Sequence, residues 1–445
     1  MADPRDLIDQ SPMSRFQWGV VAIMVGLNAL DGFDVLSISF ASPGLAAAWH
    51  VERAALGFVL STELVGMSLG SFILGGAADR FGRRVTILTC LVIMATGMFG
   101  AASARGVLSL SAWRVLTGIG IGGMLASTNA AVAEASNVVR RNLSVVLMAG
   151  GYPLGAIVGG IISSHLLRSH EWNAVFLFGG SVTLAFIPLI WWLSPESISF
   201  LAQRGGAEAL GKINRTLARM GHPPADRLPD LTTRRAMPIA GLFRPPLARP
   251  TVLLTIAYLA HIMTFYFILK WIPKIVVDMG FAPAEAAGVL VWANVGGALG
   301  SLLLGLLTLR LRLPLLTICA MLASTALVIW FGRGQDGLAQ LSLIAACAGF
   351  CTNAGVVGLY ALVAGAFPTR VRASATGFVI GVGRGGSALA PALAGLLFAA
   401  GYALSSVATC MAVGSSVAAA SIALFARRPT TLEPNGSLEP HGSAS

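Results

Sequence analysis

Long apolar segments that recur between clusters of charged residues constrain this sequence more than any other feature. Twelve such segments occur, each close to the roughly 20 residues that cross a bilayer as a helix. Only 11% of the 445 residues are charged, against about 25% in soluble domains, which excludes an ordinary soluble enzyme. The expected spans cover 18–46, 55–78, 85–104, 108–133, 142–167, 172–193, 250–275, 284–309, 314–332, 338–364, 374–398 and 401–426. The predicted fold class is therefore all-α integral membrane, with twelve transmembrane helices.

One break between spans is much longer than the others and divides the chain into two six-helix halves. It carries nine basic residues and several prolines, a composition typical of a solvated linker. Two six-span halves also suit transporters, whose substrate sites lie near the bilayer midplane between repeats. The predicted parts are an N-terminal segment 1–17, a first half 18–193, a linker 194–249, a second half 250–426 and a tail 427–445.

The distribution of Lys and Arg predicts the orientation of the helices. Of the 30 basic residues, 22 fall in the termini, the linker and the loops on one side, and five fall on the other side. Cytoplasmic loops carry the excess of positive charge, so both termini and the linker are expected in the cytoplasm, with the chain in the inner (plasma) membrane. The net charge of +11 is mostly this topology signal, and it requires no nucleic-acid partner.

The loop between the second and third spans has a distinctive spacing of glycines and charges. It runs Gly75, Gly76, Ala77, Ala78, Asp79, Arg80, Phe81, Gly82, Arg83, Arg84. Gly75 permits close helix approach, Asp79 can pair with a basic group, and Gly82 allows a tight turn. The loop matches every fixed position of the GxxxD-[RK]-x-G-[RK]-[RK] signature of the major facilitator superfamily, which the chain therefore resembles. The resemblance implies a cytoplasmic gate built from Gly75, Asp79, Arg80, Gly82, Arg83 and Arg84.

Within that superfamily, the first span resembles the aromatic acid:proton symporters. Their DGxD signature corresponds to Asp31-Gly32-Phe33-Asp34, and similar stretches occur at 114–120, 152–155, 271–273 and 372–384. The resemblance covers residues from about 18 to 400. It implies uptake of benzoate-like or hydroxybenzoate-like anions together with protons.

Six ionisable side chains lie well inside the expected spans: Asp31, Asp34, Glu63, Arg114, Lys270 and Arg384. Each costs about 2.5–3.5 kcal/mol at a helix centre if it is unpaired. Three acids and three bases sum to zero, so we expect them to face one another around a cavity. A substrate carboxylate that enters such a neutral cluster keeps it neutral only if one acid takes a proton, which is a physical basis for proton-coupled anion transport.

The resemblance and the spacing of the pair indicate Asp31 or Asp34 as the proton carrier, with Glu63 as a further proton-coupling candidate. Arg384 is the candidate clamp for the substrate carboxylate because a guanidinium binds a carboxylate bidentately. Arg114 is either a second clamp or a partner of Asp34 and Glu63.

Lys270 faces either the cavity or the membrane interface, since a lysine can extend to the membrane surface. If it faces the cavity, a third cation favours a more highly charged substrate, such as a dicarboxylic aromatic acid or a muconate. Tyr266, His261 and Asn294 complete the candidate substrate-binding residues, with packing and interhelical hydrogen bonding as their alternative roles.

The sequence therefore predicts a proton symporter that imports an aromatic carboxylate, with protons and the lipid bilayer as its other partners and a monomer as its expected state. One alternative is an exporter of organic anions or drugs, and another is a membrane sensor that binds its ligand without moving it. No phosphate loop, nucleophile triad or metal-ligand cluster occurs in the sequence, so no enzymatic activity, metal or cofactor is expected.

Overall fold

Every regular element in the described part of the chain is a helix. The computed structural model describes residues 4–74, 76–228, 239–335, 337–368 and 371–427. Within these ranges, twelve helices are long and apolar enough to cross a membrane. The predicted fold class, an all-α membrane protein with twelve transmembrane helices, is confirmed.

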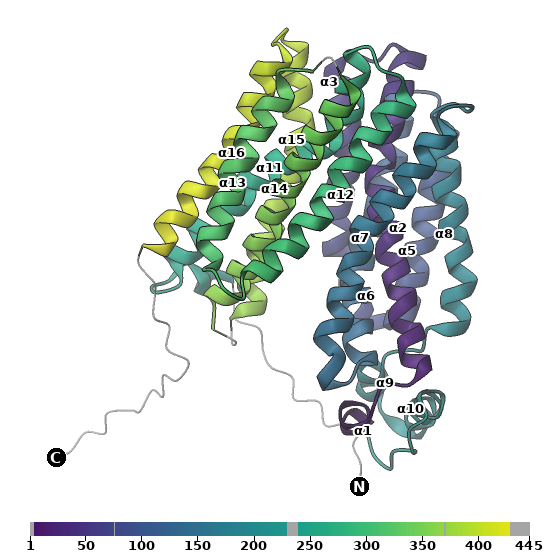
Figure 1. Ribbon diagram of the computed structural model, residues 1–445. Helices are drawn as coiled ribbons and strands as arrows, with labels where there is room; N and C mark the ends of the chain where they lie inside the picture. Colours follow the sequence, from purple (N-terminus) through teal and green to yellow (C-terminus); the bar gives the residue numbers. More distant parts are fainter. Residues whose placement is uncertain (1–3, 75, 229–238, 336, 369–370, 428–445) are drawn as a thin grey trace, which may run out of the picture.

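The transmembrane helices form two bundles of six, which lie side by side in Figure 1. The first bundle contains α2 (Arg15–Trp49), α3 (Arg53–Ile73), α5 (Arg83–Ala102), α6 (Val107–Ala135), α7 (Val138–Leu166) and α8 (Asn173–Leu193). The second contains α11 (Ala248–Asp278), α12 (Pro283–Leu307), α13 (Leu313–Gly332), α14 (Leu338–Ala366), α15 (Arg372–Ala399) and α16 (Leu404–Ala426). We call the side where α2 begins and α16 ends the near end, and the opposite side the far end.

Local sequence explains where several helices begin and end. Ser14 caps α2, since its hydroxyl accepts from the Gln17 amide at 3.3 Å and the Gln17 side chain accepts from the Ser14 amide at 2.8 Å. Asn137 caps α7 through the amide of Arg140 at 2.9 Å. The second span was expected to reach residue 78, but α3 ends at Ile73 and a separate short helix, α4 (Ala77–Phe81), follows.

Glycines let the helices of the first half approach one another closely. A side chain on Gly118 of α6 would collide with the carbonyl oxygen of Glu63 in α3, and one on Gly155 of α7 would collide with the carbonyl oxygen of Ala29 in α2. Close packing of this kind replaces the hydrophobic driving force that is missing between helices in lipid. It holds the helices that carry the intramembrane charges within side-chain reach of one another.

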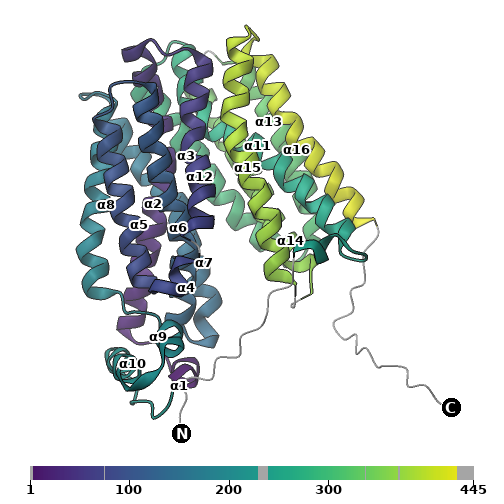
Figure 2. The same cartoon turned by 180° about the vertical axis from the view of Figure 1, so that it is seen from behind.

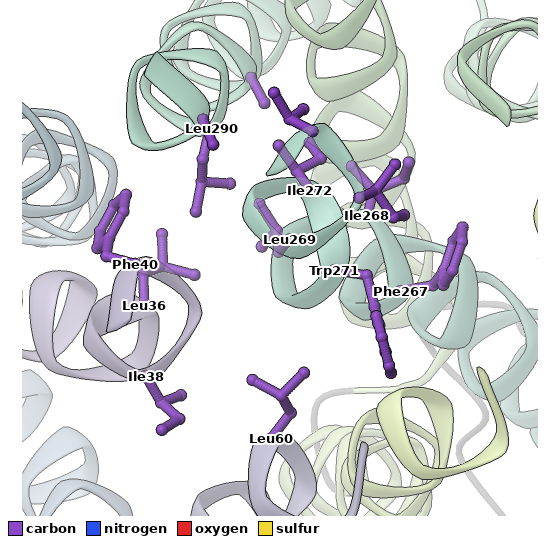
Figure 3. Close-up of a cluster of buried hydrophobic side chains, with 14 of the residues drawn as sticks. Leu36, Ile38, Phe40, Leu60, Phe267, Ile268, Leu269, Trp271, Ile272 and Leu290 are labelled. Atoms are coloured by element: carbon purple, nitrogen blue, oxygen red, sulfur yellow. The ribbon is translucent and has the colours of Figure 1, made fainter. Parts of the chain in front are cut away.

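The two halves join at the far end. There, α3 packs against α15, α7 against α12 and α2 against α11, and one apolar core contains residues of both halves. Figure 3 shows Leu36, Phe40 and Leu60 of the first half facing Trp271 and Leu290 of the second. Toward the near end the halves have separate apolar cores, and Figure 2 shows the two bundles diverging in that direction.

The linker contains helices that the sequence analysis did not predict. They are α9 (Ile198–Arg204), α10 (Gly206–Met220) and the 3₁₀ helix η1 (Ile239–Phe243). Together with α1 (Pro4–Gln10), α9 and α10 form a small apolar core that includes Ile8, Ile213 and Leu217. In α10 the buried apolar residues recur every three or four positions, so part of this basic segment packs instead of being wholly solvated.

Candidate functional site

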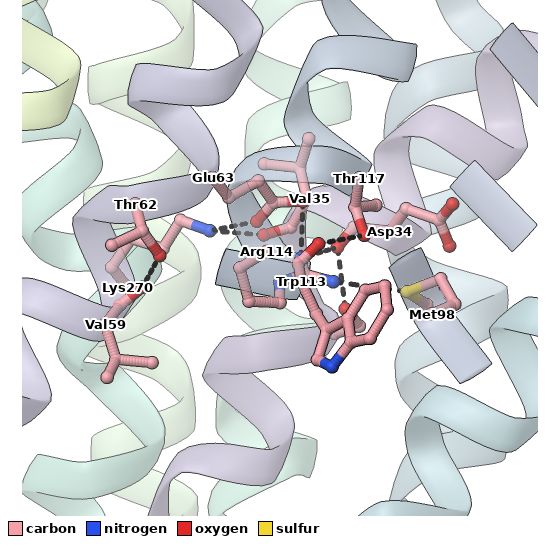
Figure 4. Close-up of polar contacts among 11 residues, drawn as sticks. Asp34, Val35, Val59, Thr62, Glu63, Met98, Trp113, Arg114, Thr117 and Lys270 are labelled. Carbon is pink, nitrogen blue, oxygen red and sulfur yellow. Dashed lines mark hydrogen bonds and ion pairs between the residues drawn. The ribbon is translucent and has the colours of Figure 1, made fainter. Parts of the chain in front are cut away.

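A buried ion cluster lies where the two halves meet. Glu63 of α3 pairs with Arg114 of α6 through Oε1 and with Lys270 of α11 through Oε2, the latter at 3.3 Å (Figure 4). All three side chains are fully buried. Lys270 therefore points into the protein and not toward the membrane interface, which decides between the two orientations left open by the sequence. One carboxylate bridges a cation from each half.

Both cations of this cluster also bind carbonyl oxygens of α2. Arg114 donates through Nη2 to the carbonyl of Asp34 at 2.8 Å, and Lys270 donates through Nζ to the carbonyl of Val35. Arg114 further contacts the Met98 sulfur at 3.1 Å and lies 5.4 Å from the centre of the Phe176 ring. Arg114 is thus held by a charge, a backbone dipole and a ring, and it has no exposed surface left for a ligand in this state.

The carboxyl groups of Asp31 and Asp34 are buried without the partners that Glu63 has. Both oxygens of Asp34 and Oδ1 of Asp31 have no hydrogen-bond partner among the described residues. The Asp34 side chain lies against Gly179 of α8, and Figure 4 shows it directed away from Glu63. A buried, unpaired carboxylate is costly, whereas a protonated carboxyl group is much less so. Burial without a partner therefore favours the protonated form of both carboxyl groups.

Arg384 lies apart from the buried cluster. Its Nη1 donates to the carbonyl oxygen of Met67 at 3.3 Å and to the hydroxyl of Ser71, both in α3 of the other half. The side chain is only partly buried, and Gly381 and Gly385 next to it have open space where a side chain would project. The two described acceptors are uncharged, so this guanidinium can still neutralise an anion.

Four of the five tyrosines in the sequence lie near this region. The hydroxyls of Tyr258 and Tyr360 are 3.0 Å apart, and the partly exposed Tyr266 packs edge-on against Phe265 with ring centres 5.3 Å apart. Tyr266 lies one helical turn from Lys270 on α11, whereas Tyr258 lies about 18 Å from Lys270 toward the near end.

The two other candidate substrate-binding residues make contacts inside the second half. His261 is fully buried, with Nδ1 2.9 Å from the Ser415 hydroxyl and Nε2 2.8 Å from the Thr352 carbonyl oxygen. Asn294 donates to the Leu290 carbonyl of its own helix at 2.8 Å. The His261 contacts match the interhelical role considered as its alternative, whereas the Asn294 bond stays within α12. A role for either residue in substrate binding stays a prediction.

The loop expected to form a gate contacts the first half and the start of the linker. Gly75 and the side chain of Asp79 lie outside the described residues. Gly82 has φ of +99°, a conformation that favours glycine, and a side chain there would meet Glu196. The Glu196 carboxylate accepts from the backbone amides of Arg83 at 2.7 Å and Arg84 at 3.3 Å, at the start of α5.

The arginine side chains of this loop have separate partners. Arg83 pairs with Glu134 at 2.5 Å, Arg84 donates to the Trp191 carbonyl, and Arg80 is exposed. Sequence reasoning missed Glu134 and Glu196. A lone acid at the start of a basic linker was the available signal for Glu196, since a carboxylate is favoured at a helix N-terminus. In the described ranges no group of three His, Cys, Asp or Glu residues is arranged to hold a metal ion.

Comparison with known proteins gives the chain its family. The sequence model of the Major Facilitator Superfamily matches residues 24–332. The gallate transporter of Pseudomonas putida is 31% identical, with 94% of each chain covered. The 4-hydroxybenzoate transporter PcaK of Acinetobacter baylyi is 28% identical over 96% of this chain and 94% of its own. The crystal structure of a D-xylose-proton symporter has the same fold, with a TM-score of 0.70, 17% identity and coverage of 92% and 96%. The chain belongs to the major facilitator superfamily and, within it, to the aromatic acid:proton symporter family.

Proposed function

We propose that this protein imports an aromatic carboxylate across the plasma membrane together with one or more protons. The observation that carries the proposal is the near full-length similarity to transporters of gallate and 4-hydroxybenzoate, over 94% and 96% of this chain. Both compounds are aromatic acids that are anions near neutral pH. Coupled transport of an anion and a proton needs buried acidic and basic side chains. The buried cluster of Glu63, Arg114 and Lys270, where the two halves meet, supports the proposal.

The positive charge of the near end supports a cytoplasmic location for that side. The far end then faces outward, and a molecule whose halves join there corresponds to an inward-facing state. In this proposal the loop at 75–84 closes the near end in the opposite state. The Glu196 and Glu134 contacts of its arginines position the start of α5 for that role.

Arg384 is the proposed carboxylate clamp. It is the intramembrane cation with some exposed surface, and its described partners are a hydroxyl and a carbonyl, which an anionic carboxylate can outcompete. In this proposal Tyr266, which is partly exposed and packs edge-on against Phe265, stacks its ring on the aromatic substrate. Arg114 and Lys270 act in this proposal through Glu63, and not as first contacts for the substrate.

Asp31 and Asp34 are the proposed proton carriers. Their carboxyl groups are buried one helical turn apart, and Arg114 is satisfied by Glu63 and by a backbone carbonyl. Protonation of one aspartate removes a charge that the surroundings do not pair. A bound substrate anion near Arg384 then enters with a proton, and the intramembrane charge stays constant.

Uptake by purified protein in liposomes tests the proposal. We expect labelled 4-hydroxybenzoate or gallate to accumulate when an inward proton gradient is imposed, and accumulation to disappear when a protonophore collapses the gradient. Liposomes that contain Arg384→Met are the matched control for specific binding. Expulsion of the label under the same gradient would identify an exporter, and binding without movement would identify a sensor.

A further inference from the structure

Two ion pairs connect α3 of the first half with α11 of the second. Arg53 Nη2 lies 3.2 Å from Asp278 Oδ2, and Glu63 Oε2 lies 3.3 Å from Lys270 Nζ. The two helices run in opposite directions, with Arg53 starting α3 and Asp278 ending α11 at the far end. At about 1.5 Å per residue, the second pair lies roughly 12–15 Å deeper than the first. We call the Arg53–Asp278 pair the outer rung and the Glu63–Lys270 pair the inner rung of this helix pair.

The surroundings of the two rungs differ. The side chains of the outer rung are 45% and 32% exposed, and exposed pairs contribute little to stability. Both side chains of the inner rung are fully buried. Separation of a buried pair leaves uncompensated charges in a medium of low polarity, which is far more costly. The inner rung therefore dominates the electrostatic attraction between α3 and α11.

Glu63 pairs with one cation of its own half and with one cation of the other half. Its pair with Arg114 stays within the first half, whereas its pair with Lys270 crosses between the halves. Lys270 adds a second crossing contact through the Val35 carbonyl of α2. The other ionisable groups that interact electrostatically with Glu63 are Asp31, Asp34, Tyr152 and Tyr266, and Arg384 of α15 reaches α3 farther along, at Ser71.

We infer that Glu63 is a resident counter-anion and that its bond to Lys270 is the latch that holds the far end shut while no substrate is bound. Lys270 and Arg114 come from opposite halves and repel each other unless an anion lies between them. Glu63 supplies that anion in the empty protein. Loss of either the Lys270 cation or the Glu63 charge lets α11 separate from α3 and opens the far end. The inference builds on the proposed transport cycle but requires no particular substrate.

Lys270→Met is the cleanest perturbation of the latch. It removes the crossing contacts but leaves Glu63 paired with Arg114, so no buried acid is left alone. Lys270→Gln is the second variant, because its amide can still donate to the Val35 carbonyl but forms no ion pair. Asp278→Asn is the matched control, a neutralising change on the outer rung of the same helix pair.

Distances between spin labels measure the far end directly. The labels go on Ser169→Cys, in the far-end loop after α7, and on Tyr402→Cys, in the loop after α15, with the five native cysteines replaced. Without substrate, we expect a single short distance in the otherwise unmodified protein and in Asp278→Asn. In Lys270→Met and Lys270→Gln the ratio of the longer to the shorter distance should rise about tenfold or more.

The outcomes distinguish a latch at the inner rung from one at the outer rung. Unchanged distances in both folded Lys270 variants would overturn the inference, and so would an equal opening in Asp278→Asn, which would place the latch at the surface. If Lys270→Met does not give a monodisperse peak in size-exclusion chromatography, the Lys270→Gln result decides. Opening of the far end in a protein that moves no aromatic acid would refute the proposed substrate and leave the latch in place.

Discussion

Replacement of Arg114 by methionine should destabilise the protein far more than the same replacement of Arg384. Arg114 is fully buried and is bound to Glu63, to the Asp34 carbonyl at 2.8 Å and to the Met98 sulfur at 3.1 Å. Arg384 is partly exposed and contacts two uncharged acceptors in α3. The two residues are both intramembrane arginines, so each is the control for the other.

The magnitudes follow from these surroundings. Breaking a buried ion pair by removal of one partner typically costs about 3–5 kcal/mol, because the remaining charge is left uncompensated. In Arg114→Met the remaining charge is Glu63, whose Lys270 contact at 3.3 Å offsets only part of the loss. Loss of the hydrogen bonds of Arg384 should cost about 1 kcal/mol, since the neutral acceptors can be solvated.

Unfolding by denaturant in detergent micelles, followed through the nine tryptophans, measures the difference. Calorimetric titration with 4-hydroxybenzoate measures binding in the same samples. We expect Arg384→Met to unfold near the wild-type midpoint but to lose substrate binding, and Arg114→Met to unfold at a much lower denaturant concentration. Equal midpoints for the two variants would refute the assignment of Arg114 to the structural cluster. Full binding by Arg384→Met would show that the clamp lies elsewhere.

Three further predictions concern coupling, packing and the near-end loop. Asp31→Asn should abolish proton-driven accumulation in liposomes but retain exchange of labelled for unlabelled substrate; undiminished accumulation would exclude Asp31 as the proton carrier. Gly118→Val should push α6 away from the Glu63 backbone and lower the yield of folded protein, whereas Gly150→Ala, at a position with open space, should be tolerated. Glu196→Gln should weaken the cap on the Arg83 amide by about 1 kcal/mol, lowering the unfolding midpoint slightly. An unchanged midpoint would show that the amides are satisfied without the charge.

Much of the fold follows from the sequence because hydrocarbon imposes a simple rule. A segment in the bilayer must satisfy its own backbone hydrogen bonds, so apolar length alone identifies a helix. The rule says nothing about solvated segments, and α9 and α10 were missed for that reason. In α10 the apolar stripe of Ile213, Leu217 and Met220 is interleaved with basic residues whose number suggested a solvated chain.

The depth of the candidate-site residues in the membrane was predictable, but the direction in which their side chains point was not. Position along each span places Glu63, Arg114 and Lys270 in one layer, because depth depends only on the count of residues from a helix end. The rotation of each helix about its axis depends on its neighbours, which the sequence does not identify. The orientation of Lys270 therefore stayed open until α11 was seen packed against α2, with the Lys270 side chain reaching Glu63 of α3. The same limit hid the Asp34 carbonyl as the acceptor for Arg114.

In the proposed transport cycle, the arrangement of charges also separates the proton-binding aspartates from the substrate site at Arg384. Glu63 between Arg114 and Lys270 leaves one positive charge, which one ionised aspartate of the DGxD stretch can balance. The second aspartate, one helical turn away and equally buried, then requires a proton, because two adjacent buried carboxylates repel each other strongly. Arg384 is left with a positive charge and neutral partners. In this proposed cycle, a carboxylate that binds at Arg384 completes the balance only while the proton stays in place, so that the anion and the proton would cross the membrane as a neutral pair.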